Sequence, residues 1–208
     1  MTEFVEVPAG KGSLGRRKPV YGVGINDAQY ETQQFVDGKQ VSCPYYSTWR
    51  GILQRCYSAS YQERQPTYLG CTVCDEWLIF SNFKSWMKSE DWKGKALDKD
   101  ILEPGNKIYS SVTCLFVTGA VNGLLNNSRS ARGEWPQGVC WHKQAGSFQA
   151  QCWVNNVYKF LGCFSNPDEA ANAYNSTKAK EITRIAYLQT DVRIRDGLLR
   201  HAELRCAA

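Results

Sequence analysis

The sequence contains no apolar run that approaches the roughly 20 residues needed to cross a bilayer. Its first residues, MTEFVEVPAGKGSLGRRKPVYG, lack the charged and then apolar segments of a secretory signal peptide. These two absences favour a cytoplasmic protein over a membrane or secreted one. Large charge imbalance is also missing, because 25 Lys and Arg against 20 Asp and Glu leave a net charge of +5. This mild excess is compatible with a polyanionic partner but does not require one.

Cysteine, in contrast, is abundant, with nine residues in a chain of 208. In a cytoplasmic protein such cysteines are expected to be buried thiols or metal ligands rather than disulfides. Cys71 and Cys74 have the Cys-x2-Cys spacing of a zinc knuckle, and Cys56 and Cys114 could complete a zinc site. The second half of the usual signature is missing, so small buried thiols are the alternative.

The composition predicts a folded α+β protein. A hydrophobic fraction of 43% is ordinary for a chain that buries a core, and 208 residues suffice for one large domain or two small ones. We expect a flexible leader over residues 1–20, a first domain over 21–127, a polar linker over 128–135 and a second domain over 136–208.

Hydrophobic periodicity predicts two helices in the first domain, one over about 48–58 and one carrying an aromatic stripe over 77–87. Next, strands over 96–102 and 112–117 flank a Pro-Gly-Asn turn, and Thr118 caps a short helix. The sequence therefore predicts a strand–turn–strand–helix unit.

The second domain shows the clearest pattern of the chain. Residues 148–155 alternate between apolar and polar side chains, which predicts a half-buried strand. Asn155-Asn156 predicts a tight turn into a partner strand, and GVCWHKQ supplies a third strand. Asn166 is a good N-cap for a following helix that covers one face of this sheet. The open face would carry Gln149, Gln151, Trp153, Tyr158 and Phe160, and exposed aromatic surfaces of this kind mark contact sites.

Residues 136–183 resemble an AP2 domain, the DNA-binding module of plant transcription factors and of phage and bacterial homing endonucleases. The resemblance lies in Gly138-Val139, LGCF at 161–164 and DEAANAY at 168–174. It implies that the sheet face enters the major groove of double-stranded DNA. The positions that match the family's DNA contacts are Gln137, Cys140, His142, Gln151, Trp153, Tyr158 and Phe160.

Several of these positions are arginine in the plant proteins, so the family's base preference does not carry over. Gln149 and Gln151 remain suited to a bidentate pair with adenine. Lys143 and Lys159 are expected to reach phosphates.

Residues 20–127 resemble the HNH-type proteins of phages, which often end in an AP2 domain. The matching pieces are RCY at 55–57, VCDEW at 73–77, LDKDI at 97–101, GNKIYSSVTCLFV at 105–117, and Asn122. The resemblance implies a ββα-metal unit in which Asp98 and Asn122 hold Mg²⁺ or Mn²⁺. If the protein is phage-encoded, its place is the host cytoplasm.

Lys99 stands where the family has its general-base histidine, and the two histidines of the chain, His142 and His201, lie elsewhere. An exposed lysine is protonated at neutral pH and is a poor base. Burial could lower its pKa, but the neighbouring Asp98 and Asp100 would oppose that shift. Asp100 could itself act as the base or as a second ligand. In the alternative interpretation, Asp98, Lys99, Asp100 and Asn106 only stabilise a hairpin.

Three functions follow as hypotheses: a metal-dependent DNA endonuclease, a DNA-binding protein whose chemistry has lapsed, and a protein that binds a host protein through its aromatic sheet face. The last segment, TDVRIRDGLLRHAELRC, places Val192, Arg195, Leu198 and Leu199 on a helical stripe. This helix is expected to pack on the sheet or, alternatively, to lie along phosphates.

Overall fold

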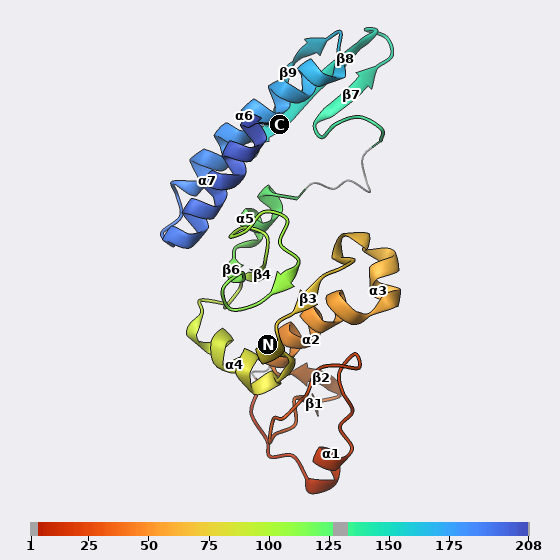
Figure 1. The fold of residues 1–208 in the computed structure, drawn as a ribbon, viewed down its shortest axis with the longest axis vertical. Helices are drawn as coiled ribbons and strands as arrows, with labels where there is room; N and C mark the ends of the chain where they lie inside the picture. The colour runs from red at the N-terminus through yellow and green to blue at the C-terminus, as the bar shows by residue number, and fades with distance from the viewer. Residues whose placement is uncertain (1–3, 127–132, 208) are drawn as a thin grey trace. The chain divides into compact units, whose positions relative to one another are not determined.

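The computed structural model describes residues 4–126 and 133–207. The chain divides into two compact units, shown in Figure 1. The first consists of Met1–Asp100 and Gly105–Phe116, and the second of Ile101–Pro104 and Val117–Ala208. The mixed α+β class is confirmed. Most of the predicted linker, residues 128–132, lies outside the described residues.

The first unit combines helices with very short strands. Its helices are α1 (Lys11–Gly15), α2 (Pro44–Tyr57), α3 (Ala59–Arg64) and α4 (Phe80–Ser89), with 3-10 turns η1 (Pro66–Tyr68) and η2 (Asp75–Leu78). Its strands are β1 (Gln33–Val36), β2 (Lys39–Ser42), β3 (Thr72–Val73), β4 (Ala96–Asp98) and β5 (Ile108–Tyr109), and β6 (Leu115–Val117) ends at its border. The two helices predicted from periodicity correspond to α2 and α4.

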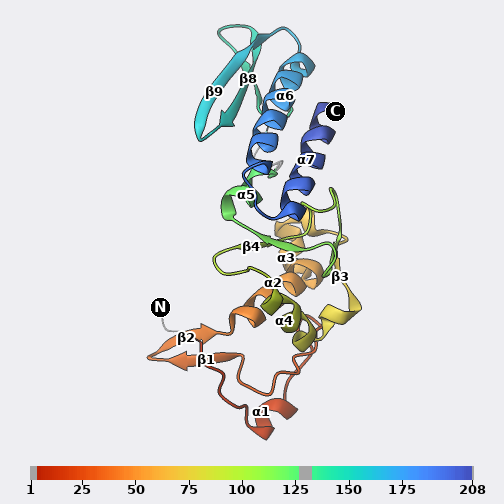
Figure 2. The same cartoon turned by 90° about the vertical axis from the view of Figure 1, so that its left-hand side faces the viewer.

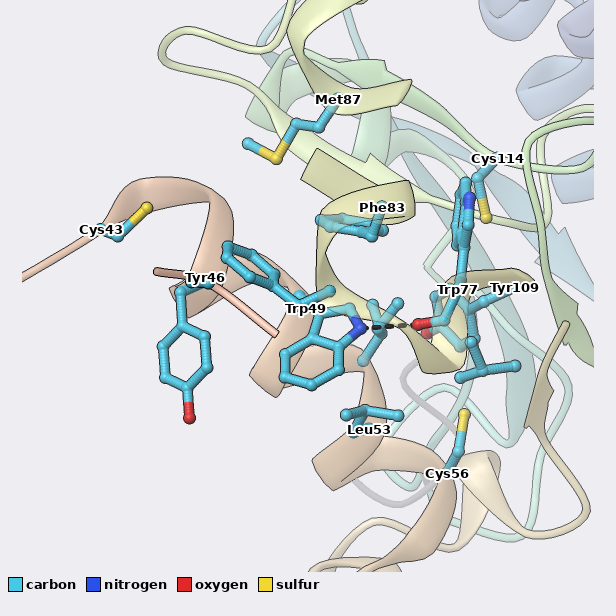
Figure 3. Close-up of a cluster of buried hydrophobic side chains, with 14 of the residues drawn as sticks. Cys43, Tyr46, Trp49, Leu53, Cys56, Trp77, Phe83, Met87, Tyr109 and Cys114 are labelled. Carbon is cyan, nitrogen blue, oxygen red and sulfur yellow. Dashed lines mark hydrogen bonds between the residues drawn. The ribbon is translucent and has the colours of Figure 1, made fainter. Parts of the chain in front are cut away.

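Aromatic side chains of α2, η2 and α4 form the core of this unit (Figure 3). Trp49, Phe80 and Phe83 are fully buried. The indole Nε1 of Trp49 donates to the carbonyl oxygen of Trp77 at 2.6 Å, so the polar atom of this buried ring is satisfied. The aromatic stripe is therefore core, as its helical spacing indicates.

The strand–turn–strand prediction over residues 96–117 is only partly correct. β4 pairs with β6, but β5 lies between them in sequence and pairs in parallel with β3. The predicted strands are also shorter than expected. The cause is local, because Asn106 and Lys99 use side-chain hydrogen bonds to hold the connecting segment in a non-strand conformation.

Two features near the N-terminus differ from the sequence prediction. The guanidinium of Arg17 donates to the carbonyl oxygens of Ala28 and Tyr30, which ties the end of the expected flexible leader to the unit. β1 and β2 form a hairpin around Asp37-Gly38, whose φ angles of 50° and 73° are the positive values of a type I′ turn. The Asp-Gly pair is the signal that predicts such a hairpin.

The second unit is built on the sheet β7-β8-β9, formed by β7 (Val139–His142), β8 (Ser147–Val154) and β9 (Val157–Phe164). Both neighbouring pairs are antiparallel, as predicted. Asn155 and Asn156 join β8 to β9 with φ angles of 51° and 59°, again a type I′ turn. α6 (Pro167–Ala186) packs on one face of the sheet, and its N-cap Asn166 accepts from the backbone N–H of Asp168.

The C-terminal helix α7 (Val192–Ala207) packs on α6, which lies between it and the sheet (Figure 2). Packing on the sheet is therefore corrected to packing on a helix. The predicted stripe is also shifted, because Val192 is exposed while Ile194, Gly197, Leu198 and Ala202 are buried. Gly197 lets α7 approach Ile101 closely, since a Cβ on Gly197 would stand 2.6 Å from the carbonyl oxygen of Ile101.

The remaining helix, α5 (Gly119–Leu124), begins at Thr118, whose hydroxyl accepts from the N–H of Val121 as the predicted N-cap. In residues 4–126 and 133–207, no helix is both long and apolar enough to span a membrane.

Candidate nucleic-acid interface

The open face of the sheet is the surface opposite α6. Cross-strand pairs Gln151–Phe160 and Trp153–Tyr158 place four of the predicted contact residues side by side on it. Trp153 is 62% exposed, Phe160 58% and Tyr158 50%, although each could have packed in a core. The predicted alternation is confirmed, since the intervening Phe148, Ala150 and Cys152 are buried.

The side chains of this face contact one another. The hydroxyl of Tyr158 donates to Oε1 of Gln151, and the Tyr158 and Trp153 rings meet edge to face with centroids 5.6 Å apart. Gln149 approaches Cys163, with Nε2 3.9 Å from Sγ. Because its oxygen is occupied by Tyr158, Gln151 presents the two donors of its amide nitrogen to a partner.

Other predicted contact residues lie at the rim or on different surfaces. Cys140 pairs with Gln149 and so shares the open face. His142 uses Nδ1 to accept from the N–H of Ala145, which stabilises the exposed turn that carries Lys143. Lys159 pairs with Cys152 and therefore belongs to the α6 side.

Gln137 lies beside Gln151 and Trp153 at the edge of the sheet, and both ends of its amide are used inside the second unit. Its Nε2 donates to the carbonyl oxygen of Asn126 at 3.0 Å, and its Oε1 accepts from Arg205 of α7 at 3.2 Å. The two polar atoms of the Gln137 side chain therefore already have partners within the protein.

The segment after β4 is organised around the buried side chain of Lys99, which is only 6% exposed. Its ammonium donates to the carbonyl oxygen of Asn106 at 2.5 Å and pairs with Oδ1 of Asp100 at 2.6 Å. The backbone N–H of Asp100 in turn donates to Oδ1 of Asp98 at 2.8 Å. The ammonium is thus a hydrogen-bond donor inside the loop, which is the opposite of the role required of a general base.

Asn106 completes this arrangement. Its amide nitrogen donates to the carbonyl oxygens of Lys99 and Ile108, at 2.9 and 2.7 Å, and its oxygen accepts from the N–H of Ile108. These bonds of the Asn106 side chain are all to the backbone of its own loop, so the side chain stabilises that loop. Asp98 ends β4 in the first unit, whereas the half-buried Asn122 lies in α5 of the second.

The cysteines of the first unit are mostly buried thiols. Burial raises the pKa of Cys56 to about 12, and the nearby Cys71 adds to the shift. Burial also raises the pKa of Cys114 to about 12. Cys74 is half-buried; its pKa is raised by burial first, and then by the charges of Glu76 and Asp75.

Burial by itself favours the protonated thiols at neutral pH, whereas a bound zinc ion would itself lower the pKa of its thiol ligands. In the part of the chain that the structure describes, no three His, Cys, Asp or Glu residues gather into a metal-binding group.

Three polar residues of the second unit, Lys178, Glu181 and Arg205, were not predicted from the sequence to be functional or structural contacts. Lys178 and Glu181 follow Tyr174 by four and seven positions, so helical spacing places both on the packed face of α6. The carboxylate of Glu181 accepts from the N–H of Asn155 and from Arg184, which fixes the β8–β9 turn to the helix. Arg205 reaches from α7 to Gln137.

Comparison of the chain with protein-family models, with curated proteins and with solved structures finds no match.

Proposed function

We propose that the protein binds double-stranded DNA through the open face of the β7-β8-β9 sheet. The observation that carries the proposal is the clustering of exposed Trp153, Tyr158 and Phe160 with Gln151 on the side of the sheet opposite α6. Exposed aromatic surface is costly to leave in water unless a partner covers it. The resemblance of residues 136–183 to AP2 domains supports DNA as that partner.

The chemistry of this face suits base edges better than phosphates. One of the two free N–H groups of Gln151 can meet an acceptor such as adenine N7, and the exposed rings can contact thymine methyl groups. A net charge of +5 supports only modest phosphate anchoring, so binding should be strongest at low salt. A protein partner is the competing occupant of the same surface.

The test is selection of duplexes from a randomised pool at low salt, followed by affinity measurements on the selected sequence. Trp153→Ala should weaken binding to that duplex about tenfold or more and reduce discrimination against mismatched sites. Tyr187→Ala is the control, because Tyr187 is 69% exposed in the same unit but lies beyond the sheet at the end of α6. Absence of any duplex binding at low salt would favour the protein-partner hypothesis.

A second candidate is slow, metal-dependent DNA cleavage at Asp98. The supporting observation is that Lys99 and Asn106 fix the loop, so that Asp98 and Asp100 are held in one defined turn. We propose that Asp98 would ligate Mg²⁺ or Mn²⁺, as the resemblance to HNH-type proteins implies. The bound ion would activate its own water, and hard oxygen ligands suit both ions.

Cleavage is tested by incubating supercoiled DNA with each ion across a pH series. Because Lys99 supplies no base, the rate should be about 10²–10⁴ below that of a site with one, and should rise with pH. Asp98→Ala should abolish cleavage, while Asp75→Ala, an exposed carboxylate of the same unit, should retain it. Equal loss in both variants, or none in either, would remove Asp98 from the proposal and leave DNA binding without catalysis.

A further inference from the structure

A cavity of about 290 Å³ opens in the second unit where β7 stops short of the end of β8. β7 pairs with β8 only as far as Ala150, and the N–H of Gln151 then donates to the carbonyl oxygen of Gly138 at 2.9 Å. Beyond that point, β8 has no strand beside it on this side among the described residues. The side chains around the opening include Gln137, Gln151, Trp153, Tyr158, Tyr174 and Lys178.

Both side-chain amide oxygens of this cavity are already occupied. Oε1 of Gln137 accepts from Arg205, and Oε1 of Gln151 accepts from the hydroxyl of Tyr158. The carboxylate of the neighbouring Glu181 is held by Arg184 and the N–H of Asn155. A ligand that brings mainly donors would therefore find few partners here.

The donors, in contrast, are free. Within residues 4–126 and 133–207, the ammonium of Lys178 makes no hydrogen bond or ion pair, and the amide nitrogen of Gln151 makes no hydrogen bond. Alternation along an antiparallel strand points the N–H of Trp153 to the same edge as the N–H of Gln151. One ammonium, one amide and one backbone N–H thus converge on the same space.

Positive charge accumulates around these donors. Burial lowers the pKa of Lys178 and the nearby Arg205 lowers it as well, whereas Cys152 and the Glu181 carboxylate, which is already paired with Arg184, raise it; Lys178 and Arg205 are thus two cations close together. An anion placed beside Lys178 would relieve this repulsion and restore the charged form of the lysine. The volume of the cavity is roughly that of ten water molecules in the liquid. It therefore has room for a tetrahedral oxyanion and part of the group that carries it.

We propose that this cavity binds a phosphate group, through Lys178, Gln151 and the N–H of Trp153, and that the phosphate belongs to the DNA backbone beside the open face. The assignment to DNA rests on the proposed function. Phosphate oxygens accept several hydrogen bonds at once, and they are the sites to which DNA-binding proteins direct ammonium, amide and backbone donors. The site would fix the register of the sheet on the duplex without reading its sequence.

The experiment uses the full chain labelled with ¹⁵N, titrated first with sodium phosphate and then, separately, with duplex DNA. Sodium chloride at matched ionic strength is the reference. The backbone signal of Trp153 and the side-chain signal of Gln151 should shift saturably with phosphate but not with chloride. Lys178→Met should abolish the saturable shift, whereas Lys180→Met, an exposed lysine of the same helix, should retain it.

Duplex DNA should displace phosphate from the wild-type cavity, and Lys178→Met should reduce the salt dependence of DNA binding by about one phosphate contact. Saturable phosphate binding that DNA leaves undisturbed would support the oxyanion site and overturn its assignment to DNA. Tight DNA binding with no phosphate response, and with Lys178→Met equal to Lys180→Met, would overturn the site and leave the proposed function intact. Failure to bind DNA at any salt concentration would instead remove the proposed function.

Discussion

Replacement of Lys99 by methionine separates a structural role from a catalytic one. Methionine keeps most of the apolar stem of the side chain but removes the ammonium. The carbonyl oxygen of Asn106 then loses its donor at 2.5 Å, in a segment where Lys99 and Asn106 are both buried. A buried polar atom left without a partner costs about 1–3 kcal/mol.

The second bond lost, to Asp100, contributes less. The Asp100 side chain is 46% exposed, so water can replace the ammonium, and pairs of this kind contribute about 0–1 kcal/mol. Together the two losses should lower the free energy of unfolding of the first unit by about 2 kcal/mol. For a unit of this size, that corresponds to a fall in Tm of about 8 °C.

The assay is thermal and urea unfolding, followed by the fluorescence of the buried Trp49 and Trp77. Lys93→Met is the matched control, because Lys93 is exposed in the same unit, and it should stay within about 0.5 kcal/mol of the wild type. A Lys99→Met protein as stable as the Lys93→Met protein would refute the structural role. If it also lost DNA cleavage, Lys99 would have to act in the reaction itself.

Three further predictions concern other contacts. Hydrogen bonds from Arg184 lower the pKa of Glu181, so this carboxylate stabilises the fold above its ordinary pKa of about 4.5, and the contribution is lost as pH falls through the lower folded pKa. Glu181→Gln should therefore be less stable than wild type by about 1 kcal/mol at pH 7, with the difference shrinking in acid; a constant difference between pH 7 and pH 3 would contradict this. A Cβ on Gly138 would stand 2.0 Å from the Tyr174 ring at a φ of +78°, so Gly138→Ala should cost at least about 2 kcal/mol in urea unfolding. Gly146→Ala, at a φ of +56° with nothing within 4 Å, should cost only about 1 kcal/mol, and equal losses would mean that the ring moves aside. With a thiol reagent, the exposed Cys163 and Cys206 should react quickly and the buried cysteines only on unfolding, whereas about one zinc per chain on metal analysis would show that a zinc site assembles after all.

The second unit was largely predictable because its signals are local. Alternation from Phe148 to Val154 fixes which side chains are buried, and Asn155-Asn156 supplies the positive φ angles of the turn. The N-cap at Asn166 then marks where α6 begins. Each signal depends on residues within a few positions of one another, so the sequence alone carries it.

The first unit was harder to predict because its decisive contacts are not local. The parallel pairing of β3 with β5 joins Thr72 to Ile108, and no short-range pattern announces it. The resemblance to HNH-type proteins aligns Lys99 with their general-base histidine, but only the structure shows its ammonium donating to Asn106. Likewise, the convergence of Lys178 and Gln151 at one cavity depends on where β7 begins, which periodicity does not specify.

The division of the chain into units carries a consequence for how it can be cut. Because Ile101–Pro104 belongs to the second unit, the polypeptide passes from one unit to the other at 100–101, 104–105 and 116–117. A fragment that begins after residue 117 would lack Ile101. This residue is fully buried and packs so closely against Gly197 that a Cβ at position 197 would clash with it. Such a fragment would carry a gap beneath α7, and a single proteolytic cut near residue 130 would leave Ile101–Pro104 on the N-terminal piece and α7 on the C-terminal one. An expressed protein that contains the second unit should therefore keep residues 101–104 together with the C-terminal half. Use of the whole chain does this.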